Sequence, residues 1–170
     1  GLYLHYWSPN WWESRVGKAK YQAVTPEVVA IQRDTLPDGV ALLDADFDLG
    51  NGIRIRAVAV DGTAVDSFLI TVYWEAVQPV PRDYSVAVQW VTEFPPQGPD
   101  NIVAQADSFH PVQGWYPTTR WAAGEVVRDV YALEAAAVPA SLPIFLAITM
   151  YHVDDIGQFV NNEWFVLSPE

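Results

Sequence analysis

The chain has 170 residues, of which 51% are hydrophobic and 18% are charged, and its nine basic and 21 acidic residues give a net charge of −12. This length and composition predict one folded domain with a sizeable core and argue against disorder. The acidic balance argues against a nucleic-acid binder, because phosphate backbones would be repelled. The absence of cysteine excludes disulfide scaffolds, zinc–thiolate sites and thiol nucleophiles.

The N-terminal stretch differs in charge from the rest of the chain. Residues 1–33 have a net charge of +2, whereas the remainder has −14. The same stretch contains six aromatic residues, namely Tyr3, Tyr6, Trp7, Trp11, Trp12 and Tyr21. Aromatic rings beside Lys and Arg are typical of a membrane interface. The pattern therefore leaves two interpretations open: a transmembrane segment precedes Gly1, or these rings pack onto the domain.

Local signals divide the N-terminal stretch from a longer domain. Ser8-Pro9 is a helix-start signal and predicts a short helix over 9–20, and Thr25-Pro26-Glu27 predicts a second helical segment to residue 33. Leu36-Pro37-Asp38-Gly39 has turn residues at turn-favoured positions. We therefore expect an aromatic, partly helical segment over 1–38 and a folded domain over 39–170.

After residue 39 the chain becomes a series of short β-type runs separated by turn signals. The predicted strands are Val40–Leu49, Ile53–Val60, Ser67–Ala76, Tyr84–Thr92, Ile102–Phe109, Glu125–Leu133, Pro143–Val153 and Trp164–Leu167. The helical period of 3.6 is absent here, which argues against a bundle or an α/β sheet. We predict an all-β fold, a single antiparallel β-sandwich of jelly-roll or immunoglobulin-like type with a short helical N-terminal extension.

Two predicted strands indicate which side chains form the core. Residues two apart in a strand share a face, which places Phe68, Ile70, Val72 and Trp74 on one inward face and Val86, Val88 and Trp90 on another. The uncharged stretch 135–151 is broken by prolines and is shorter than a membrane span. We expect it to be a loop followed by a buried strand.

Few residues have the spacing of a known chemical site. Asp44, Asp46 and Asp48 alternate but do not complete an EF-hand loop, so we expect a solvated strand face, with a calcium site as the alternative. The three histidines have no metal-ligand spacing, and there is no nucleophile-elbow or phosphate-binding motif. We therefore predict no metal, no cofactor and no catalytic residues.

The most distinctive stretch is the predicted long loop between two strands, residues 109–124. Exposed aromatic rings on such a loop can stack on sugar rings. We take Trp115, Tyr116, Arg120 and Trp121 as candidate ligand-binding residues, with Trp115 and Tyr116 as the exposed pair. The alternative is that the rings cap the open end of the fold, Trp121 in particular, with Arg120 clamped to Glu125 or Asp129.

Four segments together carry a resemblance to a known family. They are Phe68-Leu-Ile-Thr-Val-Tyr-Trp-Glu-Ala, Asp83-Tyr-Ser-Val-Ala-Val-Gln, Ile102-Val-Ala-Gln-Ala-Asp-Ser and Gly114-Trp-Tyr-Pro-Thr-Thr-Arg-Trp-Ala-Ala-Gly-Glu-Val-Val-Arg-Asp129. Over residues 40–153 the chain resembles a β-sandwich domain of Chloroflexi-type bacteria, the extracytoplasmic tail of multi-pass and often glycosyltransferase-like membrane proteins. The chain departs from that pattern at residues 95–100 and in its N-terminal segment. The resemblance implies a surface-facing accessory domain and brings no catalytic residues with it.

These observations give one predicted function and one alternative. We predict a non-catalytic accessory or binding module on the outer side of a bacterial membrane, with a glycan or an envelope protein as partner and with membrane attachment upstream of Gly1. The alternative is a small hydrolase that acts on glycans with paired carboxylates. A hydrolase needs carboxylates with perturbed pKa values in a cleft, whereas a module needs only a surface patch.

Overall fold

The computed structural model describes residues 40–62, 66–134 and 144–167, with side chains from residue 45 onward. Its strands are β1 (Val40–Asp48), β2 (Ile53–Asp61), β3 (Ser67–Ala76), β4 (Ser85–Val91), β5 (Ile102–Ser108), β6 (Val126–Glu134), β7 (Phe145–Val153), β8 (Phe159–Asn161) and β9 (Phe165–Leu167). Two short 3-10 helices, η2 (Pro99–Asn101) and η3 (Thr118–Arg120), precede β5 and β6. The predicted all-β class is confirmed.

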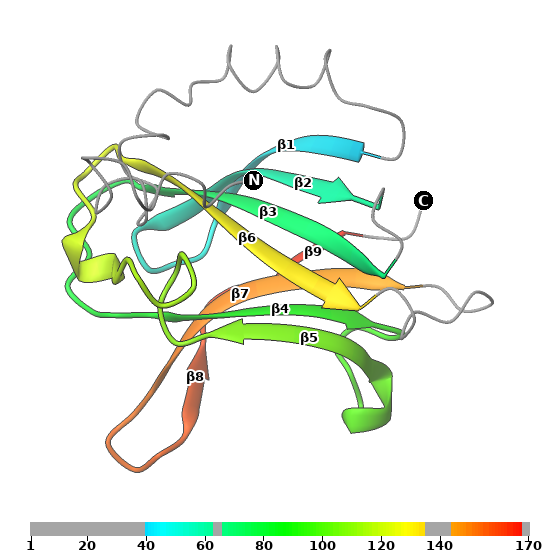
Figure 1. The fold of residues 1–170 in the computed structure, drawn as a ribbon. Coiled ribbons are helices and arrows are strands. Elements are labelled where there is room, and N and C mark those ends of the chain that lie inside the picture. Colours follow the sequence, from blue (N-terminus) through cyan, green and yellow to red (C-terminus); the bar gives the residue numbers. More distant parts are fainter. Residues whose placement is uncertain (1–39, 63–65, 135–143, 168–170) are drawn as a thin grey trace.

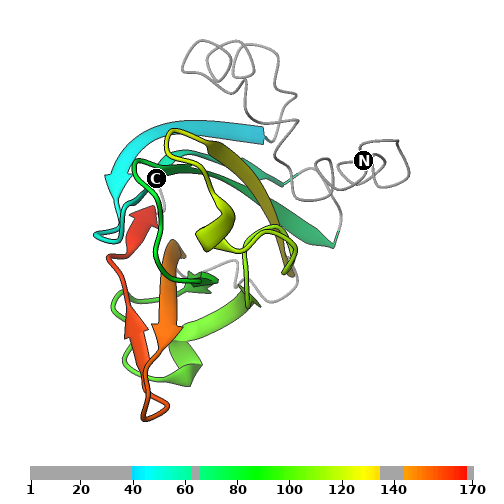
Figure 2. The same cartoon turned by 90° about the vertical axis from the view of Figure 1, so that its left-hand side faces the viewer.

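The strands form two antiparallel sheets that lie as two layers and do not close into a barrel (Figures 1 and 2). The first sheet has the order β1-β2-β3-β6 and the second the order β5-β4-β7-β8. Strand β9 pairs with the first half of β7, and β8 pairs with its last residues. The chain changes sheet three times, from β3 to β4, from β5 to β6 and from β6 to β7.

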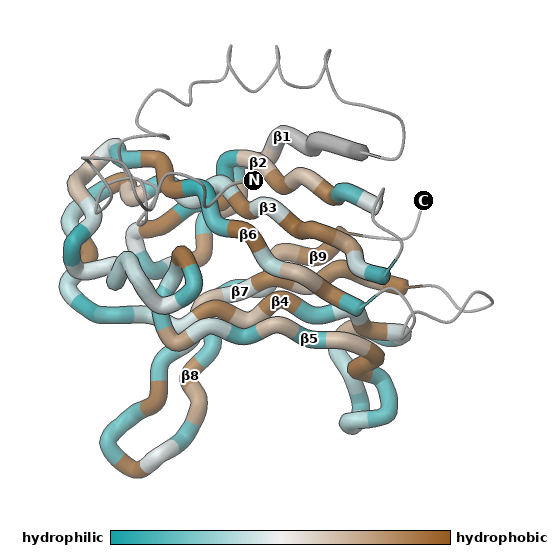
Figure 3. The backbone as a smooth tube through the Cα atoms, in the orientation of Figure 1, coloured by the Kyte–Doolittle hydropathy of each residue, from teal (hydrophilic) through white to brown (hydrophobic). Residues whose placement is uncertain are grey.

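The core lies between the two sheets. Ile55, Ile70 and Trp74 from the first sheet, and Val88 and Ile148 from the second, are fully buried in one cluster. Figure 3 shows hydrophobic segments recurring along the strands of both layers. This arrangement follows from the strand period of two, because alternate side chains point to the facing sheet.

The predicted core faces are confirmed, with Trp90 at the border of the core. Trp74 is fully buried, whereas Trp90 is half-buried and packs edge-to-face on Phe68 with ring centroids 5.5 Å apart. Within the described residues, the Trp90 Nε1 atom is buried without a hydrogen-bond acceptor. An indole N–H usually finds an acceptor when it is buried.

All eight predicted strands are present within two residues of their expected bounds. Strand β8 was not predicted. Its three residues are exposed, and it pairs with the end of β7 to make a hairpin that projects from the second sheet (Figure 1). The predicted N-terminal helices and the boundary at residues 38 and 39 lie outside the described residues.

The order of the strands positions the loop that joins β5 to β6. Strand β5 is an edge of the second sheet, and β6 is an edge of the first. The chain joins these two edges through residues 109–125, which we call the β5–β6 loop. The loop therefore lies over the open side between the layers (Figure 2).

Candidate functional site

The β5–β6 loop begins with a left-handed turn. Val112, Gln113 and Gly114 have φ values of 56°, 55° and 88°, a conformation that costs roughly 1–2 kcal/mol for a residue with a Cβ atom. The turn closes through hydrogen bonds from Gly114 N to His110 O and from Trp115 N to Val112 O, each 3.0 Å long. Such a turn persists only where surrounding contacts hold it in place.

A buried carboxylate holds this turn to the core. Asp129 is 1% exposed and points inward from β6. It accepts hydrogen bonds from Val112 N at 2.9 Å, from Trp74 Nε1 at 3.1 Å and from the Tyr131 hydroxyl. Burial raises the pKa of Asp129 to about 6, although the three hydrogen bonds act in the opposite direction. The turn is therefore fixed from inside the fold.

A second buried carboxylate holds the far half of the loop. The Tyr116 hydroxyl donates to both oxygens of Glu125, at 2.7 and 2.8 Å, and Ala122 N donates to the same group at 2.9 Å. Trp121 packs beside Tyr116 and donates from Nε1 to the Tyr116 carbonyl. Burial and the bond with Glu125 raise the pKa of Tyr116, and the charge of Arg120 lowers it.

The loop is also fixed to the start of β4. Thr118 is fully buried, and its hydroxyl donates to Arg82 O at 2.6 Å and accepts from Tyr84 N at 3.1 Å. Thr119 donates from its backbone and its hydroxyl to the carboxylate of Asp83. These contacts make the loop a closed unit with its own small core.

The four predicted ligand-binding residues divide into two buried and two exposed. Trp121 and Tyr116 are each 3% exposed, whereas Trp115 is 36% exposed and Arg120 is also exposed. The interpretation of Trp121 as a cap is confirmed. The expectation that Tyr116 is exposed is wrong, because its ring packs into the loop core and its hydroxyl is bound to Glu125. A platform made of all three rings is therefore absent.

Glu125 and Asp129, the two carboxylates expected to pair with Arg120, accept hydrogen bonds from other residues. Glu125 accepts from Tyr116 and Ala122, and Asp129 accepts from Val112, Trp74 and Tyr131. The role expected for Arg120 stays a prediction.

A cleft of about 390 Å³ opens beside the loop, between the edges β5 and β6. It is lined by Asp107, Ser108, Phe109, Gln113, Gly114, Val130, Tyr131 and Ala132. Phe109 is 76% exposed at the end of β5, and its ring lies on that of His110 with centroids 4.3 Å apart. The cleft thus offers an exposed aromatic ring next to a carboxylate and an amide.

Asp107 is the one carboxylate among the residues lining this cleft. Local burial of its carboxyl group raises its pKa. Gln113 supplies an amide from the left-handed turn, and the Tyr131 hydroxyl is already bound to Asp129. The polar groups left to face a ligand are therefore hydrogen-bonding groups rather than a metal-ligating set.

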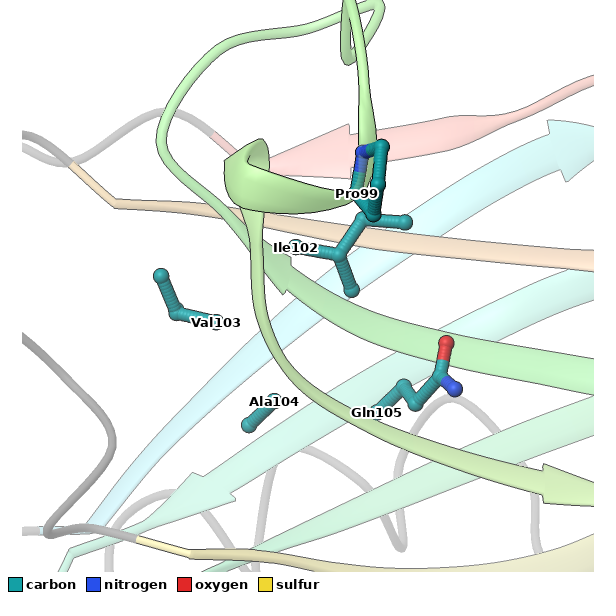
Figure 4. Close-up of a pocket in the computed structure, with 5 residues that line it drawn as sticks. All are labelled: Pro99, Ile102, Val103, Ala104 and Gln105. Carbon is teal, nitrogen blue, oxygen red and sulfur yellow. The ribbon is translucent and has the colours of Figure 1, made fainter.

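A second hollow, of about 270 Å³, lies at the other end of β5 (Figure 4). Pro99, Ile102, Val103, Ala104 and Gln105 line it. Gln105 is the one polar side chain in that lining. The first cleft is the stronger candidate because it combines an aromatic ring with polar groups from two sheets.

Two of the three aspartates near the start of the fold, Asp46 and Asp48, have described side chains, and both have partners within the chain. Asp46 forms an ion pair with Arg54, and Asp48 accepts a hydrogen bond from Gly50 N at 2.8 Å. Both aspartates are exposed, whereas Leu49 is buried. The side chain of Asp44 lies outside the described side chains, and no group of three or more potential metal ligands occurs among the described residues. The calcium alternative, which includes Asp44, stays a prediction.

Comparisons with known proteins return no match. No protein-family model matches the chain, and no curated protein or solved structure is similar to it at a significant level. The resemblance to an extracytoplasmic domain therefore stays a prediction. Within the described part of the chain, no helix has both the length and the apolar character needed to cross a membrane.

Proposed function

We propose that this chain is a non-catalytic binding module that holds a sugar unit in the cleft between β5 and β6. The observation that carries the proposal is Phe109, 76% exposed at a cleft of about 390 Å³ that also presents Asp107 and Gln113. An aromatic face packs on the apolar face of a sugar ring, and carboxylate and amide groups hydrogen-bond to its hydroxyls. Trp115, which follows Gly114 in the sequence, is a second partly exposed ring of the same loop.

The rigidity of the loop supports a binding role. Asp129 and Glu125 fix both halves of the loop from inside, so that Gln113 and Trp115 have defined positions before a ligand arrives. A site that needs no ordering on binding loses less entropy. Binding residues on a loop held by a rigid sheet are a common arrangement.

The cleft favours binding over the hydrolase alternative. Glycosidases use two carboxylates separated by about 5–9.5 Å across the scissile bond, and the cleft lining contains one, Asp107. Glu125 and Asp129 are buried and already accept two or more hydrogen bonds each. Asp107→Asn separates the two functions: it lowers affinity in a binding module, whereas it abolishes turnover of a hydrolysable glycan in an enzyme.

We place the module on the outer side of a bacterial membrane, with residues 1–33 as the stretch that contacts the membrane surface. The support is the aromatic and basic composition of residues 1–33 and the resemblance of residues 40–153. Co-sedimentation with anionic vesicles, with and without residues 1–33, tests the attachment. Equal sedimentation of both forms would contradict a juxtamembrane role for that stretch.

The strand order departs from the immunoglobulin-like type of β-sandwich and contains one Greek-key return. In the immunoglobulin fold the third strand lies in the sheet opposite to the first two, whereas β3 pairs directly with β2 here. The chain leaves the first sheet for β4 and β5, and β6 then returns beside β3. A strand that returns beside the first of four defines a Greek key, and jelly rolls contain two of them.

The cleft is tested with glycan arrays followed by titration calorimetry. We expect Phe109→Ala to lower the affinity for an array-positive neutral sugar about tenfold while the melting temperature stays within 2 °C, because an exposed ring contributes little to folding. Val77→Ala, which truncates another exposed apolar side chain, is the control and leaves affinity unchanged. Unchanged affinity in Phe109→Ala, or an array without any signal, would overturn the proposal.

A further inference from the structure

The outer face of the second sheet carries a row of aromatic and polar side chains next to the cleft. In the strand register, Ala87 lies opposite Asp107, Ser85 lies opposite Tyr151, and Tyr151 lies opposite Asn161. Directly opposed residues share a face of a sheet, and so do residues two apart. These five residues therefore lie on the face opposite to the core residues of β4 and β7. Ala87 is buried there, so the other four form the exposed row.

The members of the row also contact one another. Burial raises the pKa of Tyr151, the charge of Asp107 raises it further, and the Ser85 hydroxyl lowers it. The Tyr151 ring packs edge-to-face on Phe159 of β8, with centroids 5.5 Å apart. Phe159 is 70% exposed although it has this neighbour. The rings of Tyr151 and Phe159 thus lie side by side on the hairpin of β7 and β8; Figure 1 shows this hairpin projecting from the second sheet.

This row begins where the cleft ends. Asp107 and Phe109 line the cleft, and Ser85 Oγ donates to Phe109 O at 3.0 Å. From β5 through β4 and β7 to β8 there are three strand spacings, which is about 14 Å at roughly 4.8 Å per spacing. A single sugar ring does not cover that distance, but a chain of several sugars does.

The charges of this face select against acidic ligands. The row and the adjoining hairpin turn carry three carboxylates, those of Asp107, Asp154 and Asp155, and the described residues that form them include no Lys or Arg. Uronic-acid polymers and anionic lipid headgroups would be repelled. Neutral sugar rings, with apolar faces and many uncharged hydroxyls, match the row itself, which has aromatic rings, hydroxyls and the acceptor carboxylate of Asp107.

We propose that the row extends the cleft into an elongated groove for a neutral oligosaccharide chain, so that the natural ligand is a polysaccharide rather than a single sugar. This inference rests on the proposed function and specifies its ligand class. Phe109 is then the ring shared by both parts of the groove, and Tyr151 with Phe159 holds the sugar units furthest from the cleft.

The test is titration calorimetry on the full chain with matched short and long probes. The probes are two-unit and six-unit cello-, chito-, xylo- and malto-oligosaccharides, with polygalacturonate as the anionic comparison. For at least one series we expect the six-unit chain to bind tenfold or more tightly than the two-unit chain, and polygalacturonate not to bind. Phe159→Ala should lower the six-unit affinity about two- to tenfold, the range expected for one aromatic contact, and leave the two-unit affinity unchanged.

The variant Ile156→Ala is the control that distinguishes loss of a sugar contact in the row from a general effect of changing the hairpin. Ile156 is 77% exposed at the tip of the same hairpin and lies off the row, so Ile156→Ala should not change either affinity. Equal affinities for short and long chains, an unaffected Phe159→Ala variant or preferred binding of polygalacturonate would overturn the inference and leave the cleft proposal standing. Absence of binding to every neutral probe would instead overturn the proposed function itself.

Discussion

Replacement of Asp129 by asparagine tests whether a buried carboxylate holds the β5–β6 loop. Asp129 is 1% exposed and accepts hydrogen bonds from Val112 N, Trp74 Nε1 and the Tyr131 hydroxyl. An asparagine amide must direct its NH₂ group at Val112 N–H or at Trp74 N–H, so that one buried donor loses its acceptor. An unsatisfied buried donor costs about 1–3 kcal/mol of unfolding free energy.

The pH dependence gives the sharper test. Burial raises the pKa of Asp129 from 3.8 to about 6, so the folded protein holds this proton more tightly than the unfolded chain does. The stability that Asp129 contributes is therefore complete below about pH 4 and falls as the pH rises through about 6. A shift of this size corresponds to about 3 kcal/mol. The difference in stability between wild type and Asp129→Asn should shrink by up to that amount from pH 4 to pH 7.5.

Urea unfolding followed by tryptophan fluorescence at pH 4, 5, 6 and 7.5 measures this difference directly. Asp155→Asn, at an exposed position of the β7–β8 turn, is the control and should stay within about 0.5 kcal/mol of wild type. A difference between wild type and Asp129→Asn that is the same at all four pH values would refute the assignment of Asp129 as a buried group that titrates near pH 6.

Three further predictions concern the loop and the hairpin. Tyr116→Phe removes the hydroxyl that donates to both Glu125 oxygens and should cost about 1–3 kcal/mol in urea unfolding; a neutral result would show that the loop core does not depend on this bond. Trp121→Ala, which empties a site that is 3% exposed, should cost about 3–5 kcal/mol, and a change below about 1 kcal/mol by calorimetry would contradict its role as a cap. Gly157→Ala places a Cβ atom at a φ of 83° in the β7–β8 turn and should cost about 1 kcal/mol, whereas Gly98→Ala, where φ is extended, should cost less.

The strands were predictable because burial in two sheets imposes a period of two on the sequence. The start of β2, Ile53-Arg-Ile-Arg, alternates between buried and half-buried positions. In β3 the inward positions 70, 72 and 74 are fully buried, and Thr71 and Tyr73 on the other face are buried as well. Strand β8 has only three residues, all of them exposed. Its sequence therefore shows no alternation of apolar and polar residues that would predict a strand. Backbone pairing with the end of β7, rather than a buried face, forms that strand.

The candidate site was less predictable than the fold. An aromatic ring in a loop can face the solvent or the loop core, and for Tyr116 the outcome depended on Glu125, nine residues further along the chain. Asp107 and Gln113 come together with β6 only because the chain crosses between the sheets at this point. One signal was available: Asp129 shares an inward face with Val127 and Tyr131, and a carboxylate in such a position indicates a buried hydrogen-bond network.

We propose that the cleft beside Phe109 and the row beyond it bind a neutral sugar chain. A nuclear magnetic resonance titration of the ¹⁵N-labelled chain with the six-unit oligosaccharides maps the contact residue by residue. Backbone shifts should cluster at residues 107–114 and 130–132 and extend to 151 and 159, and the strands of the opposite sheet edge, β1 and β2, should not respond. Shifts confined to β1 and β2, or no saturable shift with any neutral series, would contradict the claim.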